Sequence, residues 1–218
     1  MPSGVKSETL CRLATVREFL HWAAREDSTH GAFGSGARAA KGLVFIQNYA
    51  TYEFTVTASV KALLSNLNAL ALTVQVVRPE LQALVLDADF CSVIQGSSRR
   101  TWENRIDLLR RSRCGEVAAV HDGLFPKDGS QFRPPQLDLL WDMFGFSSPV
   151  LPHPRLRQTI IEMVENRNKI AHGNEPPENV GRRYTIADLE RRIDDTEQIC
   201  THVATTFLQY LSEANAFR

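Results

Sequence analysis

The sequence predicts an all-α protein, and three observations lead to that fold class. Apolar residues recur every three or four positions over long stretches of the 218-residue chain, which is the period of a helix face. A period-two alternation, typical of half-buried strands, is absent even between residues 51 and 60, where Thr, Val and Tyr raise strand propensity. Helix-ending signals such as the Arg78-Pro79 pair bound these stretches.

The first half of the chain holds two predicted helices separated by a flexible, glycine- and serine-bearing loop at residues 28–37. The first helix, 8–26, has its apolar residues at helical spacing: Leu10, Leu13, Val16, Leu20 and Ala23. The second runs from Arg38 to Val77 and carries two neighbouring stripes. One stripe follows positions 46, 50, 60, 64 and 67 and includes Glu53 and Thr57; the other contains Phe45, Tyr49, Tyr52, Val56 and Leu63.

The second half contains helices interrupted by longer irregular segments. Residues 80–98 are ambiguous between helix and turn, and residues 102–113 return to a helical pattern. Three glycines and three prolines make 114–135 a predicted long loop. A short helix at 136–144, a motif-bearing helix at 155–172 and a loop at 173–183 follow. The last helix begins at a Thr185-x-x-Asp188 capping box.

These elements suggest residues 1–37 as an N-terminal helix and loop, and residues 38–218 as a helical domain with an irregular segment near 114–135. The 25 basic and 25 acidic residues balance, so any nucleic-acid surface must be local. The four cysteines lie far apart and the six histidines lack ligand spacing, so we expect no metal centre and no cofactor. Without a run of eighteen apolar residues or an apolar signal core, we expect a cytoplasmic protein without a membrane span.

The segment Arg167–Gly173 is the most informative part of the chain. It reads Arg-Asn-Lys-Ile-Ala-His-Gly at the end of a predicted helix, with Gly173 as its C-cap. Arginine stays charged and can clamp a phosphate, whereas histidine exchanges protons near neutral pH. The pair suggests acid–base chemistry at a phosphodiester, where RNA supplies its own 2′-hydroxyl nucleophile. The same spacing also occurs at Arg25 and His30, but there we expect a glycine-rich loop rather than a packed helix.

Arg167–Gly173 resembles the Arg-Asn-x-x-x-His signature of HEPN domains. Two further stretches are similar to the subgroup called RiboL-PSP-HEPN-like: residues 42–54, which resemble its tyrosine-alanine-x-x-glutamate helix, and residues 137–146, which resemble the segment ahead of the motif helix. The resemblance covers roughly residues 40–212. It implies an all-α HEPN-like helical bundle that dimerises through the motif helix and often cuts RNA without metal.

Four residues are candidates for the catalytic site, and each has a structural alternative. Arg167 could stabilise charge on phosphorus, or it could pair with a nearby glutamate. His172 could act as acid and base, or it could offset the helix dipole. Asn168, which shares a helix face with His172, could orient the imidazole, bind phosphate or act as a packing residue. Glu53 lies on an apolar stripe, so it could pair with Arg167, or its side chain could lie at an exposed rim.

Several basic residues could guide RNA, although solvated helix faces explain most such runs. Arg99, Arg100 and Arg105 belong to a segment that carries six arginines against Glu103 and Asp107. Nearer the motif, further basic side chains could contribute to a positive groove: Lys169, Arg182 and Arg183.

Helical geometry places Arg167 and His172 about 140° apart on one helix, so a single helix brings them together poorly. We therefore expect a homodimer whose motif helices assemble one cleft. The expected function is a metal-independent endoribonuclease that acts on RNA as a toxin or phage-defence effector, with an antitoxin or defence-system protein as a possible partner. The alternatives are a non-catalytic module that dimerises or binds a nucleotide or partner, and the inhibitory partner of another toxin. Asn174 occupies the position where some HEPN toxins carry a modified tyrosine, which argues against regulation by that route.

Overall fold

The computed structural model describes residues 2–30, 34–120 and 132–212, and within them the chain is all-α, as expected from the sequence. Its one β-type pairing among these residues is an isolated bridge between Thr73 and Val117. In chain order the elements are α1 (Pro2–His30), α2 (Ser35–Ala69), the 3₁₀ helix η2 (Val74–Val76), α3 (Pro79–Val85), α4 (Asp87–Gln95), α5 (Ser98–Arg111), α6 (Pro134–Phe144), α7 (Leu156–Ala171), α8 (Pro177–Gly181) and α9 (Ile186–Ser212).

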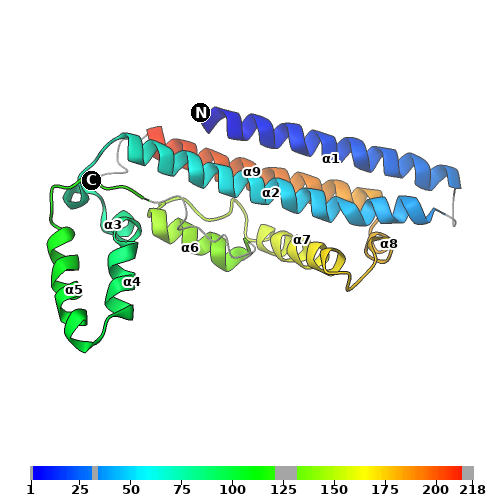
Figure 1. Ribbon diagram of the computed structural model, residues 1–218. Helices are drawn as coiled ribbons and strands as arrows, with labels where there is room; N and C mark the ends of the chain where they lie inside the picture. Colours follow the sequence, from blue (N-terminus) through cyan, green and yellow to red (C-terminus); the bar gives the residue numbers. More distant parts are fainter. Residues whose placement is uncertain (1, 31–33, 121–131, 213–218) are drawn as a thin grey trace.

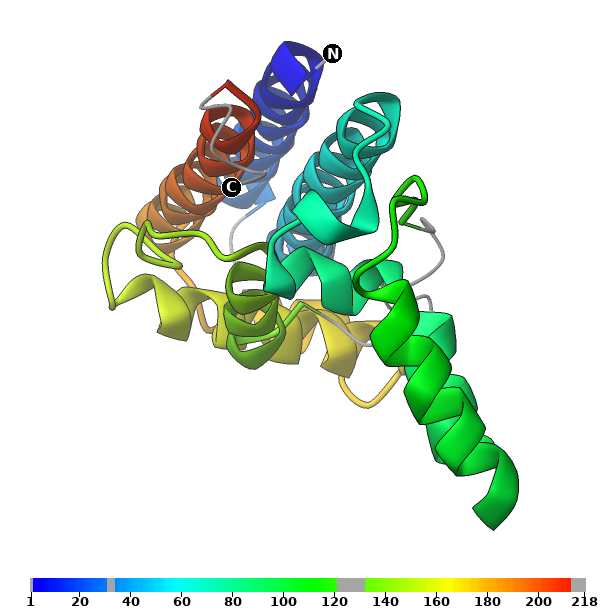
Figure 2. The ribbon, with the colours of Figure 1, turned by 90° about the vertical axis from the view of Figure 1, so that its left-hand side faces the viewer.

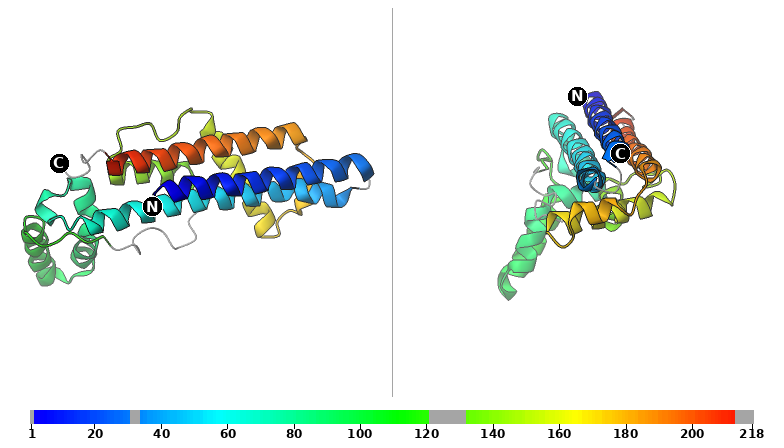
Figure 3. Two further views of the ribbon diagram at one scale, coloured as in Figure 1. Left: turned by 90° about the horizontal axis from the view of Figure 1, so that it is seen from above. Right: turned by 90° about the vertical axis from the view of Figure 1, so that its right-hand side faces the viewer.

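Three long helices, α1, α2 and α9, each pack against the other two and form the main bundle of the molecule (Figures 1 and 3). The chain runs in one direction along α1 and returns along α2, and α9 is parallel to α2. The shorter helices α6 and α7 cover one side of this bundle, and α8 packs on α2. Helices α4 and α5 project from the end of the bundle that lies far from α8 (Figures 1 and 2).

The core has two connected parts that meet along α2. The larger part joins α2 to α3, α6, α7 and α9, and it includes Tyr52, Phe144 and Ile160. The smaller part joins the first half of α2 to α1, α8 and α9, and its members include Leu20 and Val180. Burial of these apolar side chains is the main favourable contribution to folding. The N-terminal helix therefore shares its core with the rest of the chain.

The second of the two stripes on α2 is the better buried one. Phe45, Tyr49, Tyr52, Val56 and Leu63 are all almost fully inaccessible to solvent. The first stripe is buried only at positions 60, 64 and 67, because Ala50 is exposed and residues 46, 53 and 57 are partly exposed. Glu53 therefore lies at the rim of the core rather than inside it.

Two predicted element boundaries in the first half of the chain were wrong. The segment predicted as a loop at 28–37 is helical up to His30 and again from Ser35, and residues 31–33 lie outside the described residues. The helix predicted to reach Val77 ends at Ala69, because Ala71 adopts a positive φ of 46° that interrupts α-helical geometry. The ambiguous segment 80–98 forms α3 and α4.

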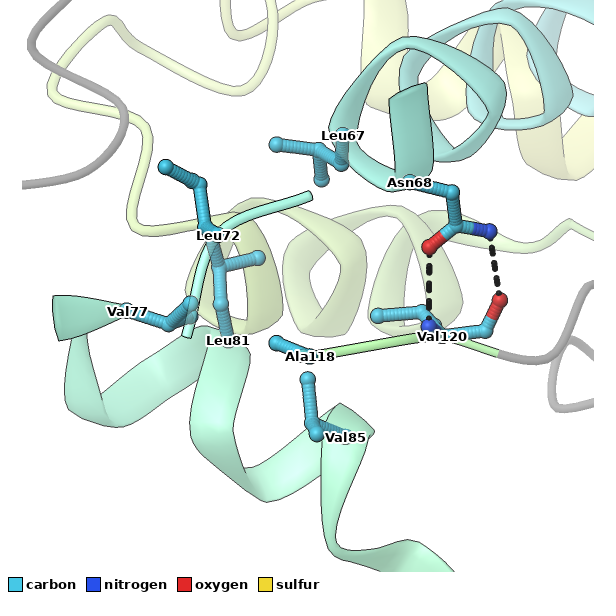
Figure 4. A pocket seen from close by; sticks show the side chains of 8 residues that line it. All are labelled: Leu67, Asn68, Leu72, Val77, Leu81, Val85, Ala118 and Val120. Atoms are coloured by element: carbon cyan, nitrogen blue, oxygen red, sulfur yellow. Dashed lines mark hydrogen bonds between the residues drawn. The ribbon is translucent and has the colours of Figure 1, made fainter. Parts of the chain in front are cut away.

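A short backbone pairing closes the base of the α3–α5 segment. The amide of Ala118 donates to the carbonyl of Leu72 (2.6 Å), and that of Val74 donates to Glu116 (2.9 Å). Beside this pairing, the Asn68 side chain forms two hydrogen bonds with the backbone of Val120, of 3.0 Å and 2.9 Å (Figure 4). These contacts order residues 114–120 of the predicted loop, whereas residues 121–131 lie outside the described residues.

The predicted loop at 173–183 contains the short helix α8, which lies against α2 with almost no space between the two backbones. A Cβ atom at Gly42 would overlap the carbonyl oxygen of Pro177. A Cβ atom at Gly181 would overlap the carbonyl oxygen of Arg38. Because glycine lacks a Cβ, the two helices can approach closely only with this residue at the crossing.

The two predicted helix-terminal signals near the motif are confirmed. Gly173 has a φ of 69° and its amide donates to the carbonyl of Ile170 at 3.0 Å, which ends α7 in a left-handed residue. At the start of α9, the amide of Asp188 donates to Thr185 Oγ1 (3.1 Å) and the amide of Thr185 donates to Asp188 Oδ2 (3.0 Å). The carboxylate therefore serves as the reciprocal partner in a capping box.

We predict that Gly181→Ala destabilises the protein, because the added methyl group must displace the backbone of α2. The expected loss is about 1–3 kcal/mol of unfolding free energy. The matched control is Gly36→Ala, whose Cβ would meet no heavy atom within 4 Å. In a helix that change should leave stability unchanged or raise it by about 0.5–1 kcal/mol. Urea unfolding of both variants measures the difference, and equal stabilities would contradict the proposed close contact.

Candidate functional site

The motif residues lie at the C-terminal end of α7, next to α8. Arg167 is within the last turns of the helix and is partly buried, whereas His172 is the exposed C-cap residue. The His172 amide still donates to the carbonyl of Asn168 at 3.0 Å, so the helical hydrogen-bond pattern continues up to the motif histidine. Gly173 then turns the chain towards α8.

Arg167 is held between α7 and α2. Its guanidinium carbon lies 4.7 Å from the centre of the Tyr49 ring, within the range of a cation–π interaction. Its Nη1 donates to Asn168 Oδ1 at 3.0 Å. The hydroxyl of Tyr49 in turn donates to Glu53 Oε1 at 3.3 Å. Within the described residues, Tyr49 rather than a direct ion pair therefore connects Glu53 to Arg167.

Arg167 and His172 lie on different sides of α7, in agreement with the helical angle. Positions 158, 161, 165, 168 and 172 fall within about 80° of one another, and none of them is fully buried. Arg167 lies on the side that faces Tyr49 of α2. No hydrogen bond joins Arg167 to His172 among the described residues, so one chain does not focus both side chains on a single point.

A polar cluster fixes the orientation of α7 against the start of α9. The Tyr184 hydroxyl donates to Glu162 Oε1 at 2.9 Å, and it accepts a hydrogen bond of 3.0 Å from Asn166 Nδ2. Arg192 of α9 pairs with the second oxygen of the same glutamate. Burial raises the pKa of Tyr184 above its ordinary value, so its hydroxyl remains a neutral donor at physiological pH. Glu162 therefore pairs with Arg192 rather than with Arg167.

The candidate RNA-binding residues form two separate groups. Lys169 lies within the motif, and its carbonyl accepts a hydrogen bond of 3.0 Å from the Glu175 amide. The side chain of Glu175 pairs with Arg183, and Arg182 is exposed at the end of α8. These basic residues therefore belong to the same end of the molecule as His172.

Three further candidates, Arg99, Arg100 and Arg105, are on α5. That helix lies at the opposite end of the bundle from the C-terminus of α7 (Figures 1 and 3). Within one chain they are therefore remote from the motif, and their contact with RNA stays a prediction.

The structure adds a role for Tyr49 and changes the interpretation of the Arg25–His30 match. Tyr49 is buried, as expected, but it also contacts Arg167, a role that the sequence pattern did not indicate. In the sequence, the available signal for this contact was that Tyr49 lies one helical turn before Glu53, which was a candidate partner of Arg167. The expectation that the Arg25–His30 match does not lie on a helix was wrong, because α1 continues through His30, while residues 31–33 of the predicted glycine-rich loop lie outside the described residues. Helical context therefore does not by itself distinguish the two matches.

Among residues 2–30, 34–120 and 132–212, no group of three or more His, Cys, Asp or Glu side chains is arranged to hold a metal ion. In the same part of the chain, no helix combines the length and apolar character that crossing a bilayer requires.

Comparison with known protein families decides the relationship that the fold and motif suggest. A family model described as HEPN_MAE_28990-like HEPN matches residues 12–215. The chain belongs to the HEPN family. This match begins within α1, at residue 12, and does not identify the RiboL-PSP-HEPN-like subgroup, which stays a prediction. No curated protein and no solved structure gives a significant match. Membership is compatible with a nuclease-type domain, and the HEPN family also includes non-catalytic members.

We predict that the stability of this HEPN protein falls between about pH 10 and pH 12, in part because of Tyr49. Burial, followed by the charge of Glu53, raises the pKa of Tyr49 to about 12. A tyrosine in the unfolded chain ionises near pH 10. The stabilising difference is therefore present below pH 10 and is lost as the pH rises through the folded pKa.

Urea unfolding of the wild type and Tyr49→Phe between pH 8 and pH 12 tests this linkage. The variant keeps the ring beneath Arg167 but has no ionisable hydroxyl, so its stability should decline less steeply above pH 10. Below about pH 9 the difference between the two proteins should be constant, which provides an internal control. Parallel curves above pH 10 would contradict the assignment to Tyr49.

Proposed function

We propose that this HEPN protein is an endoribonuclease that cleaves RNA by attack of the 2′-hydroxyl on the adjacent phosphorus. The observation that carries the proposal is the paired arrangement at the end of α7. Arg167 is positioned by Tyr49 and Asn168, while His172 stands exposed about one and a half turns further on. Basic side chains of the α7–α9 connection lie at the same end of the molecule and can attract a phosphodiester backbone.

Arg167 has the properties required to stabilise the transition state. As the 2′-oxygen attacks, negative charge accumulates on the non-bridging oxygens of a five-coordinate phosphorus. A guanidinium donates several hydrogen bonds in a plane and keeps its charge at all physiological pH values. The Tyr49 ring and the side-chain oxygen Oδ1 of Asn168 limit its rotation, which reduces the entropy lost when it binds phosphate.

His172 would transfer the protons. In this mechanism one imidazole accepts the 2′-hydroxyl proton as the new O–P bond forms, and an imidazolium donates a proton to the departing 5′-oxygen. The products are a 2′,3′-cyclic phosphate and a 5′-hydroxyl end. The substrate supplies the nucleophile and Arg167 supplies positive charge, so the proposed reaction does not require a metal ion.

The remaining candidates have supporting roles in this proposal. Asn168 orients the guanidinium through its side-chain oxygen and lies on the same side of α7 as His172. Glu53 acts through the Tyr49 hydroxyl rather than on the substrate. Lys169, Arg182 and Arg183 would guide the RNA backbone to the cleft.

We further propose that the active form is a homodimer in which two copies of α7 line one cleft. The incompletely buried row of Gln158, Ile161, Glu165, Asn168 and His172 faces away from the core and is available for this contact. A two-fold axis beside the motif would place Arg167 of one protomer near His172 of the other. This arrangement would resolve the angular separation within a single helix.

Cleavage of RNA by purified protein in the presence of chelator provides the first test. We expect His172→Ala and Arg167→Ala to lower the rate by at least about 100-fold, because each removes a group that acts in the transition state. The control is His21→Ala, which changes an exposed histidine on α1. An RNA with a 2′-deoxy nucleotide at the cut site should resist cleavage. Equal activity of the wild type and His172→Ala would refute the proposed mechanism.

Mixed dimers test the composite cleft. We expect a mixture of Arg167→Ala and His172→Ala protomers to recover part of the wild-type rate, because one of the two sites in each mixed dimer contains both intact residues. Each variant alone should stay inactive, and the recovered rate should depend on the mixing ratio. A wild-type protein that is monomeric at the assay concentration and fully active would refute the shared cleft.

One observation favours a second candidate function, a non-catalytic HEPN module. The Arg167 guanidinium already has two partners within its own chain, which is also what a purely structural arginine requires. In that case the wild-type protein cleaves no RNA, and the effect of Arg167→Ala is a lower melting temperature. Dimerisation or nucleotide binding would then be the function to examine.

A further inference from the structure

Helices α4 and α5 form an antiparallel hairpin that projects from the bundle (Figures 1 and 2). None of the residues of α4 is buried. The main neighbour of α5 is α4 itself. The hairpin therefore contributes little to the common core, although the pairing of residues 72–74 with residues 116–118 and the Asn68 contact hold its base firmly (Figure 4).

Three contacts define the sides by which the two helices face each other. Near the tip, Thr101 Oγ1 donates to the carbonyl of Gly96 at 3.0 Å. Halfway along, Asn104 Nδ2 donates to the carbonyl of Ser92 at 2.8 Å. Near the base, Arg111 pairs with Asp89 at 2.7 Å. The order of these contacts confirms that the helices are antiparallel.

Large apolar side chains occupy a different side of both helices. Phe90 and Ile94 of α4 are 43% and 81% exposed. Trp102, Ile106 and Leu109 of α5 are 65%, 47% and 63% exposed. In each helix these residues lie about 125–190° round from the mean direction of the contact residues, in the same rotational sense. Because the helices are antiparallel, the same sense of rotation turns both sets away from the helix–helix contact and towards one face of the hairpin. We call these five residues the hairpin strip.

The charges beside the hairpin strip are mostly basic, and Asp87 of α4, about 40° from the α4 members of the strip, is the acidic exception. Arg99, Arg105 and Arg110 lie within about 75° of the strip on α5, whereas the acidic residues Glu103 and Asp107 lie further round the helix. The Arg105 guanidinium carbon lies 4.9 Å from the centre of the Trp102 ring, so it borders the apolar surface directly. The ion pairs of Arg99 with Glu103 and of Arg110 with Asp107 are highly exposed, and such pairs exchange partners at small cost.

We propose that the hairpin strip is a docking site for an acidic amphipathic helix of a partner protein. Contiguous exposed apolar surface on a folded chain is typical of interaction sites. The aliphatic side chains of the strip can interlock with the side chains of a partner helix, whereas nucleic-acid bases do not pack in this way. Glutamate or aspartate residues flanking the apolar face of the partner helix would meet Arg99, Arg105 and Arg110. A second copy of the hairpin would instead bring the same arginines together, which disfavours self-association. This inference does not depend on the proposed nuclease activity.

The test uses the full-length protein and two labelled helical peptides of equal length. Both carry leucine at positions i, i+4 and i+7; one has glutamate at the flanking positions and the other has lysine. In fluorescence anisotropy we expect the glutamate peptide to bind at least about tenfold more tightly than the lysine peptide. Arg105→Glu should reduce this preference, because it reverses one of the charges beside the strip.

A double variant, Ile106→Ser with Leu109→Ser, should weaken binding of the glutamate peptide by about tenfold or more. The matched control is Leu139→Ser, which changes a leucine of α6 that is 56% exposed outside the strip. All of these side chains are exposed, so melting temperatures should stay close to that of the wild type. Equal binding of both peptides, or binding unaffected by the double variant, would overturn the proposal.

Two further measurements distinguish a partner helix from the two other candidate occupants of the strip, RNA and a second copy of the chain. If the double variant weakens binding of a single-stranded RNA and leaves peptide binding unchanged, the strip is an RNA path and the proposal is wrong. If sedimentation shows a dimer that the double variant dissociates, the occupant is a second copy, and the proposal is equally wrong. Unchanged RNA binding and an unchanged oligomeric state support it.

Discussion

The close contact between the backbones of α2 and α8 determines where the candidate site can form. Gly42 and Gly181 allow the two helices to meet without intervening side chains. Because α8 follows the motif after a short turn, this contact fixes the connection that carries Arg182 and Arg183. It also places the end of α7 beside the part of α2 that contains Tyr49. A larger residue at the crossing would move the basic connection and Arg167 relative to each other.

Polar contacts between α7 and α9 add orientation to this packing. Arg155 lies 3.0 Å from Asp195, whose other oxygen accepts a hydrogen bond of 3.0 Å from Thr159. Asp195 is almost fully buried, and a buried carboxylate is tolerated because it is paired and hydrogen-bonded. Together with the Glu162 cluster, these contacts restrict rotation of α7 about its axis. Arg167 is consequently directed towards α2, while Asn168 and His172 remain on the open side.

This arrangement holds the Arg167 side chain in place and leaves the His172 side chain accessible to solvent. The aromatic ring and the amide oxygen that hold Arg167 reduce its freedom, as is useful for a residue that must meet a phosphate in one geometry. His172, at the end of the helix, is exposed to solvent and can reach a substrate or a second protomer. The α4–α5 hairpin lies at the other end of the bundle, so contact with a partner there and chemistry at the motif need not compete for space.

The sequence by itself determined the all-α class, the position of the motif near the end of a helix, and the helix-terminal roles of Gly173, Thr185 and Asp188. These features depend on local spacing and on backbone preferences that act within a few residues. The spacing of Arg167, Asn168 and His172 is equally local, and together with the segments 42–54 and 137–146 it indicated the HEPN family. What decided the rest was tertiary structure. It showed that the Tyr49 stripe is the better buried of the two stripes on α2, and that Glu53 reaches Arg167 through Tyr49. It also showed that α2 ends at Ala69, so that residues 72–74 can pair with residues 116–118. It also separated the arginines of α5 from the motif. The physical reason is that these outcomes depend on contacts between residues far apart in the chain. Helical periodicity identifies apolar faces, but the element that covers each face is chosen by packing of the whole molecule.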